Sequence, residues 1–352
     1  MEGLEIQNLQ KSFGDKAVLQ GISFQQGIGE ILALLGPSGS GKTTLLEIIA
    51  GLDNPDQGDC LWDGKSLLGI PPHLRSFGLM FQEYVLFPHK NVGDNIAFGL
   101  KMAQKDKEFT STRVKEVLDL VGLAGFEDRD INTLSGGEQQ RIALARSLAP
   151  EPRLVMLDEP LGALDRNIRE RLVGELRQIL KKACQTALYV THDQEEAFNI
   201  ADRIVILGDG KAAQIGTPQE IYYHPNSVYI AQFLGMNNFL EGTATPNQAG
   251  SLLNSSLGSW QVKMKFEGNG TILIRPDRIN CKPDENEKQI SLTGKLLSSS
   301  FSGSALHLEI EINNEVIKIL NIESNLDIPQ PGEQIQIWFT ADESLHFFPA
   351  EN

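Results

Sequence analysis

Short apolar runs alternate with longer stretches of helical periodicity over about the first 235 residues of the chain. The apolar runs are residues 31–35, 154–157, 188–190 and 204–207. Continuous runs of this length are typical of strands that helices bury on both faces, as in a parallel sheet. Residues 171–182 instead repeat their apolar positions every three to four residues, which predicts a helix. We therefore expect an α/β domain over residues 1–235.

The pattern changes after Gly235. Apolar and polar residues then alternate one by one, as at Val262, Met264 and Phe266, and again over residues 306–312. This period of two indicates antiparallel strands with one buried face. Clusters of Gly, Asn, Ser and Pro separate the alternating segments, as turns require. We therefore expect a second, all-β domain over residues 236–352.

Length and composition favour two soluble domains. The chain has 352 residues, of which 41% are hydrophobic and 22% charged, so a packed core is expected. A formal net charge of −15 argues against a nucleic-acid binder, which would carry a basic face. No apolar run reaches the roughly eighteen residues of a membrane span, and the polar N-terminus is unlike a signal peptide. Three widely spaced cysteines suit a reducing cytosol, so we expect an intracellular protein.

A glycine-rich segment lies between the apolar run at 31–35 and a helical run at 44–49. It comprises Gly36, Pro37, Ser38, Gly39, Ser40, Gly41, Lys42, Thr43 and the first helical residue, Thr44. This is the phosphate-binding loop pattern, in which glycines let backbone N–H groups curl around a triphosphate and the helix directs its positive end at it. Lys42 is expected to reach the β- and γ-phosphates, and the Thr43 hydroxyl to bind Mg²⁺. The strand before and the helix after argue against an incidental glycine-rich turn.

Two carboxylates directly follow the apolar run at 154–157. Asp158 and Glu159 would lie at the C-terminal edge of a parallel sheet, where such folds bind ligands. Asp158 is expected to hold Mg²⁺ through its water shell, and Glu159 to polarise the attacking water as general base. His192 follows another apolar run and is expected to contact the γ-phosphate, although a lone histidine at a strand end is more often structural.

A second turn of Ser and Gly precedes a helical run at 139–148. Its residues are Ser135, Gly136, Gly137 and Glu138. The turn predicts a second anion-binding helix N-terminus. Because the chain already has one phosphate loop, two such ends make sense if two copies of the chain face each other, each completing the nucleotide site of the other.

With these motifs in this order, the chain resembles the ATP-binding cassette (ABC) family. The resemblance implies a P-loop NTPase fold with a helical subdomain at about residues 83–150, ATP and Mg²⁺ as cofactors, and a homodimer. Phe13 occupies the position where the family stacks an aromatic ring, often Tyr, on adenine. Gln82 matches the glutamine that senses Mg²⁺ and the attacking water, Asp165 falls in the dimer-contact loop, and His192 is the switch histidine.

Three functional classes share this ATPase. Exporters usually carry membrane helices in the same chain, and soluble ABC proteins usually have paired cassettes or a long coiled-coil insertion; neither feature is found in this sequence. Residues 83–89 and 92–100 resemble the importer subfamily, in which this region receives a coupling helix from a separate membrane permease. Lys90 stands where that subfamily commonly has an apolar residue, and residues 84–87 also fit the core of the helical subdomain.

The all-β part resembles the small OB-like (TOBE-type) regulatory domain of importer ATPases, for example at residues 273–277. Residues 272–276 and 345–349 are similar to ferric-iron importers. The resemblance therefore implies ferric iron as cargo, an external solute-binding protein, and a peripheral position at the cytoplasmic face of a prokaryotic inner membrane. Polyamine, sulfate or thiosulfate and sugar cargo remain alternatives, and a soluble ABC ATPase unlinked to transport is a remote one. No nucleic-acid partner is expected.

Overall fold

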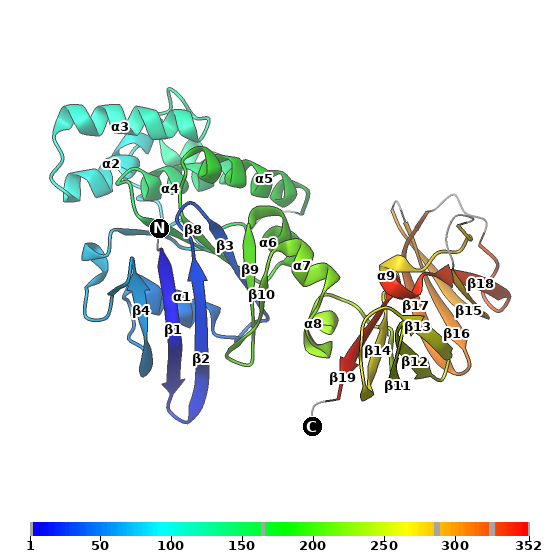
Figure 1. The fold of residues 1–352 in the computed structure, drawn as a ribbon. Helices are drawn as coiled ribbons and strands as arrows, with labels where there is room; N and C mark the ends of the chain where they lie inside the picture. Colours follow the sequence, from blue (N-terminus) through cyan, green and yellow to red (C-terminus); the bar gives the residue numbers. More distant parts are fainter. Residues whose placement is uncertain (1–2, 163–165, 285–288, 304, 324–327, 351–352) are drawn as a thin grey trace. The chain divides into compact units, whose positions relative to one another are not determined.

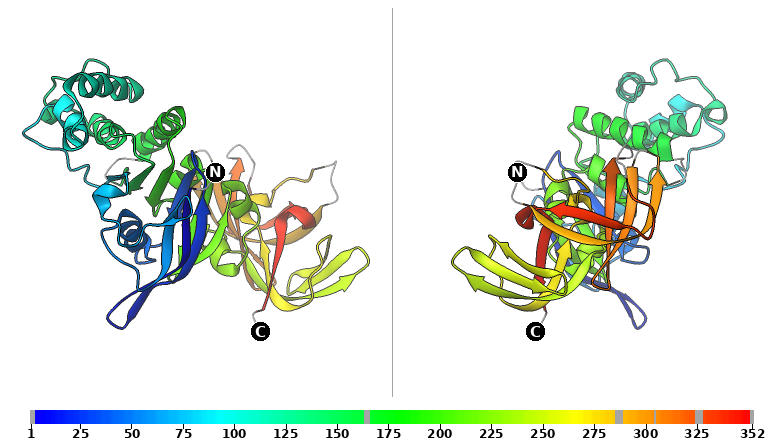
Figure 2. Two further views of the ribbon diagram at one scale, coloured as in Figure 1. Left: turned by 60° about the vertical axis from the view of Figure 1, so that its left-hand side comes forward. Right: turned by 90° about the vertical axis from the view of Figure 1, so that its right-hand side faces the viewer.

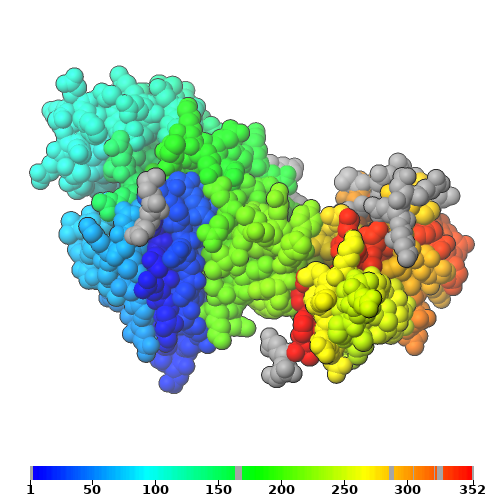
Figure 3. Space-filling model, viewed as in Figure 1, coloured from blue at the N-terminus to red at the C-terminus, as the bar shows by residue number. Residues whose placement is uncertain are grey.

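The computed structural model describes residues 3–162, 166–284, 289–303, 305–323 and 328–350. These residues divide into two compact units, with the boundary between His224 and Pro225. Figures 1 and 3 show both units coloured along the sequence. Among the described helices, none has the length and apolar content that crossing a bilayer would need.

A mostly parallel sheet of six described strands forms the centre of the first unit (Figure 1). In spatial order the strands are β10 (Lys211–Gly216), β9 (Arg203–Gly208), β3 (Ile31–Leu35), β8 (Ala187–Thr191), β7 (Leu154–Asp158) and β6 (Phe77–Met80). The pairings from β9 to β6 are parallel, and β10 adds antiparallel to β9. All residues of β3 and β8 are buried, as expected of strands covered on both faces. The predicted α/β fold is confirmed.

An antiparallel sheet and one helix cover one face of this central sheet. The sheet has the order β2 (Lys16–Gln26), β1 (Leu4–Phe13), β4 (Gln57–Trp62) and β5 (Lys65–Ser66). Helix α1 (Lys42–Ala50) contacts β2 and β7, so it lies between the two sheets. Leu32 and Leu34 of β3 pack with α1 and the antiparallel sheet in one apolar core. On the outside of this unit, β1 and β2 form a continuous surface (Figure 3).

Three helices in the chain between β6 and β7 gather at one end of the first unit (Figure 1). They are α2 (Val92–Met102), α3 (Lys107–Leu120) and α4 (Gly136–Leu148). The other helices of this unit are α5 (Arg166–Lys182), α6 (Gln194–Ile200) and α7 (Pro218–Tyr223). Helix α6 packs on β3 and β8 and against α5. The helix predicted over 171–182 is confirmed within α5, where Leu172, Leu176 and Leu180 are buried.

The second unit begins with α8 (Val228–Phe233) and continues as two antiparallel sheets around a shared core. The first sheet has the order β13 (Gly258–Val262), β12 (Gly250–Ser255), β11 (Phe239–Asn247), β14 (Gly268–Ile274) and β19 (Leu345–Pro349). The second has the order β17 (Glu315–Glu323), β16 (Ala305–Ile312), β15 (Ile290–Ser302) and β18 (Gln334–Phe339), and the short helix α9 (Ala341–Ser344) precedes β19. Figure 2 shows the two as separate sheets. The predicted all-β fold class is confirmed for this part of the chain, and the compact unit starts at Pro225 instead of residue 236.

One predicted strand is shorter than its alternating pattern. The alternation through Met264 and Phe266 predicts a strand beyond Val262, but β13 ends there and the side chain of Met264 is 59% exposed. The backbone of the next residues bonds to side chains instead of to a neighbouring strand. Ser251 Oγ accepts from the Phe266 N–H at 2.7 Å and donates to its carbonyl at 2.9 Å. These bonds fix residues 263–267 as a loop. The alternation of apolar and polar side chains therefore does not determine the backbone conformation here.

Candidate active site

The glycine-rich loop leaves β3 and enters α1 through positions that only glycine fits. Gly41 caps α1 with a φ of 99°, and a Cβ added there would lie 2.6 Å from Leu19 Cδ2. A Cβ on Gly36 would lie 2.5 Å from the carbonyl oxygen of Leu207. The loop is therefore shaped by close packing on β2 and β9, and it keeps the helix N-terminus open toward a ligand.

The polar groups of this loop fit a phosphate chain. Lys42 is buried, and its Nζ donates to the carbonyl oxygens of Gly36 at 2.8 Å and Pro37 at 3.0 Å. Burial lowers the pKa of Lys42, because desolvation disfavours the cation and the nearby Glu159 and Asp158 only partly oppose it. The buried Ser40 Oγ has no hydrogen-bond partner among the described residues. A desolvated cation, an unpaired hydroxyl and a helix N-terminus without acidic residues in its first turn together suit an anion.

Three neighbouring parallel strands bring further predicted residues to the same sheet edge. Asp158 is the last residue of β7, Gln82 follows β6, and His192 directly follows β8. Because parallel strands end at one edge, these side chains meet there, as the sequence predicts. Burial raises the pKa of the Asp158 carboxyl, with further upward contributions from the charges of Glu159 and Glu47 and a downward one from Lys42.

Glu159 links the ends of two neighbouring strands at this edge. Its backbone has a φ of 43°, in the left-handed region, and its N–H donates to the Val190 carbonyl at 2.9 Å. The Oε1 atom of Glu159 lies 3.0 Å from His192 Nδ1. A Cβ added to Gly162 would lie 3.1 Å from Gln82 Nε2 and 3.8 Å from Glu159 Oε2, so both side chains flank this glycine. The structure thus brings Gln82, Glu159 and His192 together.

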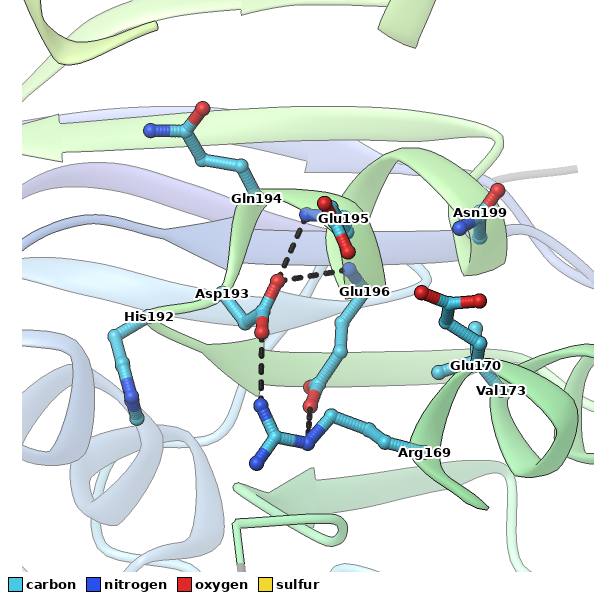
Figure 4. Close-up of a pocket in the computed structure, with 9 residues that line it drawn as sticks. All are labelled: Arg169, Glu170, Val173, His192, Asp193, Gln194, Glu195, Glu196 and Asn199. Atoms are coloured by element: carbon cyan, nitrogen blue, oxygen red, sulfur yellow. Dashed lines mark hydrogen bonds and ion pairs between the residues drawn. The ribbon is translucent and has the colours of Figure 1, made fainter. Parts of the chain in front are cut away.

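Ion pairs that sequence reasoning missed lie beside His192 (Figure 4). Arg169 of α5 donates from Nη1 to Asp193 Oδ2 at 2.9 Å, and its Nε lies 3.5 Å from Glu196 Oε1. These residues border a hollow of about 410 Å³ that His192 also lines. The pairs tie α5 to the loop that carries His192.

Hydroxyl groups complete this network. Glu196 is buried, and its Oε2 accepts from the hydroxyls of Tyr189 and Thr191, each at 2.8 Å. Burial raises the pKa of Glu196, and the two hydroxyl hydrogen bonds oppose the shift. Asp193 caps α6 by accepting from the N–H groups of Glu195 and Glu196. An acid followed three residues later by Glu is a helix-start signal that could have identified Asp193 and Glu196, whereas no local signal points to Arg169.

Ser135 and Glu138 form a reciprocal cap at the start of α4. Ser135 N and Oγ both donate to Glu138 Oε2, at 2.8 and 2.7 Å, while Ser135 Oγ accepts from the Glu138 N–H. These bonds lower the pKa of the Glu138 carboxyl, so it stays ionised. Gly136 and Gly137 form the first turn of the helix. The helix start expected here is present, on a different element from the phosphate loop.

Phe13 belongs to a different element. Phe13 is at the end of β1 with its ring 54% exposed, and Lys11 Nζ lies 5.2 Å from the ring centroid. The exposed ring has room for a planar ligand group. Asp165 lies outside the described residues.

Residues 83–90 form an irregular segment that two side chains missed by sequence reasoning hold in place. Asn95 is fully buried, accepts from the Phe87 N–H at 2.8 Å and donates to three carbonyls of the segment and its end. Arg146 of α4 donates to the carbonyls of Tyr84 and Val85, both at 2.8 Å. These hydrogen bonds satisfy backbone carbonyls of a segment that has no regular secondary structure, and they fix its conformation.

Two protein-family models match this chain. "ABC transporter" matches residues 19–162, which span the phosphate loop, the start of α4 and Glu159. The TOBE domain model matches residues 272–348 of the all-β unit. Two curated relatives align over nearly the whole chain. The "Fe(3+) ions import ATP-binding protein FbpC" of Streptomyces avermitilis is 42% identical over 93% of each chain. The "Spermidine/putrescine import ATP-binding protein PotA" of Clostridioides difficile is 42% identical over 92% of each chain.

The chain belongs to the ABC importer ATPases. Among solved structures, cbiO1 from Clostridium perfringens, described as part of the ABC transporter complex cbiONQ, matches with a TM-score of 0.59 and 28% identity. That match covers 63% of this chain and 91% of cbiO1. The predicted P-loop fold followed by a TOBE domain is confirmed.

Proposed function

We propose that Glu159 is the general base of ATP hydrolysis in this importer ATPase. The observation that carries the proposal is the 3.0 Å approach of its carboxylate to His192 at the sheet edge that also presents Lys42. Lys42 binds the β- and γ-phosphates, and Glu159 accepts the proton of the attacking water. Gln82 and His192 orient that water and the γ-phosphate, and Phe13 stacks on adenine.

The carboxylates at this edge fit Mg²⁺. Burial and the charges of Glu159 and Glu47 raise the pKa of Asp158, so a cation bound beside it would stabilise the ionised carboxylate. Thr43, Asp158 and Gln82 would hold the ion, directly or through water. When bound, Mg²⁺ would neutralise part of the phosphate charge.

Two copies of the chain complete each ATP site in this proposal. The loop at residues 36–43 of one copy binds the triphosphate, and Ser135, Gly136, Gly137 and Glu138 at the start of α4 in the other copy close over it. Asp165 belongs to the contact between the copies. ATP favours the closed dimer because only that state surrounds the phosphates from both sides.

A separate membrane permease is the proposed partner of residues 83–90. Apolar side chains are exposed around this segment, with Val85 56%, Phe81 47% and Phe98 37% accessible. A coupling helix of the permease would cover them, which places the ATPase at the cytoplasmic face of the membrane as a peripheral subunit. An external solute-binding protein would deliver cargo to the permease.

The proposed cargo is ferric iron. Support comes from the relative named for Fe(3+) import, which aligns over 93% of the chain. Spermidine or putrescine is the second candidate, because the relative named for that cargo is equally identical at 42%. The ATPase site itself is the same for either cargo, so a transport measurement has to distinguish them.

The test is uptake of radiolabelled ferric iron and radiolabelled spermidine by host cells that lack the chromosomal copy of this gene. The cells carry the wild-type protein, Glu159→Gln, or Glu195→Gln as a matched control at an exposed acid. If Glu159→Gln loses iron uptake but keeps spermidine uptake, and Glu195→Gln keeps both, ferric iron is supported as the cargo. Loss of spermidine uptake with intact iron uptake would move the cargo to polyamines. Loss of neither, in a variant shown to have lost ATP hydrolysis, would exclude both.

A further inference from the structure

The segment that follows Gln82 holds a strained backbone conformation. Tyr84 and Val85 have φ angles of 57° and 40°, in the left-handed region that residues other than glycine rarely adopt. For Val85 the conformation is especially unfavourable, because its side chain is branched at Cβ. The two hydrogen bonds from Arg146 hold this shape from α4. Strain maintained by surrounding contacts is common at switch regions of proteins.

Tyr84 links this segment to the hydrolytic loop. Its hydroxyl donates to the carbonyl oxygen of Pro160 at 3.0 Å, and Pro160 is the residue directly after Glu159. Pro160 is buried, and Glu159 itself has a positive φ and contacts His192. A side-chain hydrogen bond therefore connects the segment proposed to receive the permease with the backbone of the residue that follows the proposed base.

The phenol group suits such a link. A phenol hydroxyl is protonated at neutral pH, so it can donate the hydrogen bond to the Pro160 carbonyl. The next residue, Val85, has an exposed side chain. A partner that contacts Val85 therefore acts on the same piece of backbone that positions the Tyr84 hydroxyl.

We propose that Tyr84 is a positioning residue that transmits permease docking at residues 83–90 to Glu159 through its hydrogen bond to Pro160. The proposal rests on the proposed function, in which Glu159 is the base and this segment contacts the permease. When docking shifts the segment, the carbonyl of Pro160 follows the Tyr84 hydroxyl, and the Glu159 carboxylate turns relative to the attacking water. If Tyr84 only filled space with its ring, phenylalanine would serve equally well.

The test compares Tyr84→Phe with the wild type in the complete transporter, copurified with its permease, and in the isolated ATPase. ATP hydrolysis is measured over a range of ATP concentrations. We expect the kcat of the transporter to fall about tenfold, the scale of one hydrogen bond, while the KM for ATP changes by less than about twofold. The ratio of the transporter rate to the isolated-subunit rate should fall as well. Tyr223→Phe on α7 is the matched control, since it removes a hydroxyl from a partly exposed ring outside the site.

Three results would overturn the positioning role. They are an unchanged kcat, an equal loss in the transporter and the isolated subunit, and loss of copurification with the permease, which would assign Tyr84 to docking. Glu159→Gln measured in parallel separates this proposal from the function on which it rests. If Glu159→Gln hydrolyses ATP at the full rate, Glu159 is not the base. If Glu159→Gln is inactive but Tyr84→Phe keeps the wild-type ratio of transporter rate to isolated-subunit rate, only the role of Tyr84 is rejected.

Discussion

Glu159 and His192 face each other across neighbouring strands, with the glutamate Oε1 atom 3.0 Å from the histidine Nδ1 atom. The two residues follow β7 and β8, which pair in parallel with Asp158 opposite Val190. The positive φ of Glu159 turns its backbone out of the strand direction and still lets its N–H bond to Val190. This arrangement holds a carboxylate and an imidazole at the sheet edge that also presents Lys42, where the proposal has Glu159 accept a proton from the attacking water and His192 help to orient it.

Glu159→Gln should abolish most ATP hydrolysis while ATP binding persists. The amide keeps the size of the side chain and can still contact His192, but it cannot accept the proton, so kcat should fall by about 10² to 10⁴. Phosphate release measures turnover, and equilibrium binding of a fluorescent ATP analogue measures affinity. Normal turnover in this variant would remove Glu159 as the base.

Gly41→Ala should weaken ATP binding strongly. A Cβ there would lie 2.6 Å from Leu19 Cδ2 and 3.0 Å from the Val18 carbonyl, and the φ of 99° disfavours any side chain. The loop must therefore shift, and we expect ATP affinity to fall by at least about tenfold, since a left-handed alanine alone costs about 1–2 kcal/mol. Gly125→Ala is the control, because Gly125 has a φ of 78° with nothing within 4 Å of an added Cβ. It should lower stability by the same cost of about 1–2 kcal/mol and leave ATP affinity intact, whereas equal effects on affinity would refute the packing argument.

Local sequence patterns predict most of the fold and of the site. The runs at 31–35 and 154–157 are buried strands, and the residues that follow each of them lie at one sheet edge, because parallel strands end together. The turn at Ser135 is a helix start, as its spacing from Glu138 indicates. These features can be predicted because the residues that determine each strand or helix start lie within a few positions of it in the sequence.

The long-range contacts that hold the site together cannot be predicted from local sequence patterns. Arg75 donates to the carbonyls of Ile48 and Ile49 at the end of α1, both at 2.8 Å, and no spacing in the sequence joins these positions. Arg169 and Arg146 likewise bond to segments that only the tertiary fold brings near. The strand predicted through Phe266 fails for the same reason, since the Ser251 side chain captures the backbone of that residue.

Asp158→Asn should stabilise the nucleotide-free protein at neutral pH. Burial and neighbouring carboxylates raise the pKa of Asp158 above its unfolded value, so its contribution to stability is fully present below the unfolded pKa and is lost as pH rises through the folded pKa. The asparagine carries no charge to desolvate, and its Tm should exceed that of the wild type by a few degrees at pH 7, with the gap closing in acid.

Asp202→Asn provides the control of opposite sign. Burial of Asp202 is outweighed by hydrogen bonds from the Ile31 N–H and Lys181 and by the charges of Lys181 and Arg177, so the pKa of Asp202 is lowered. Its contribution to stability is present above the unfolded pKa and is lost as pH falls through the folded pKa. This variant should therefore unfold at a lower temperature than the wild type at pH 7, and the difference should shrink in acid. Thermal unfolding from pH 4 to 8 measures both, and parallel curves for the two variants would contradict the assignment.

Ser135→Arg should block dimer closure and leave ATP binding by one copy largely intact. The substitution removes the reciprocal cap with Glu138, which costs about 0.5–2 kcal/mol, and places a long cation where the proposal seats the phosphates of the other copy. Thr217→Arg is a matched control, because Thr217 forms the same cap with Glu220 at the start of α7. Both variants should lose similar stability in thermal unfolding, but only Ser135→Arg should lose ATP-dependent dimerisation in sedimentation and ATP hydrolysis in the assembled transporter. Full hydrolysis by Ser135→Arg in that assembly would mean that each chain completes its own site.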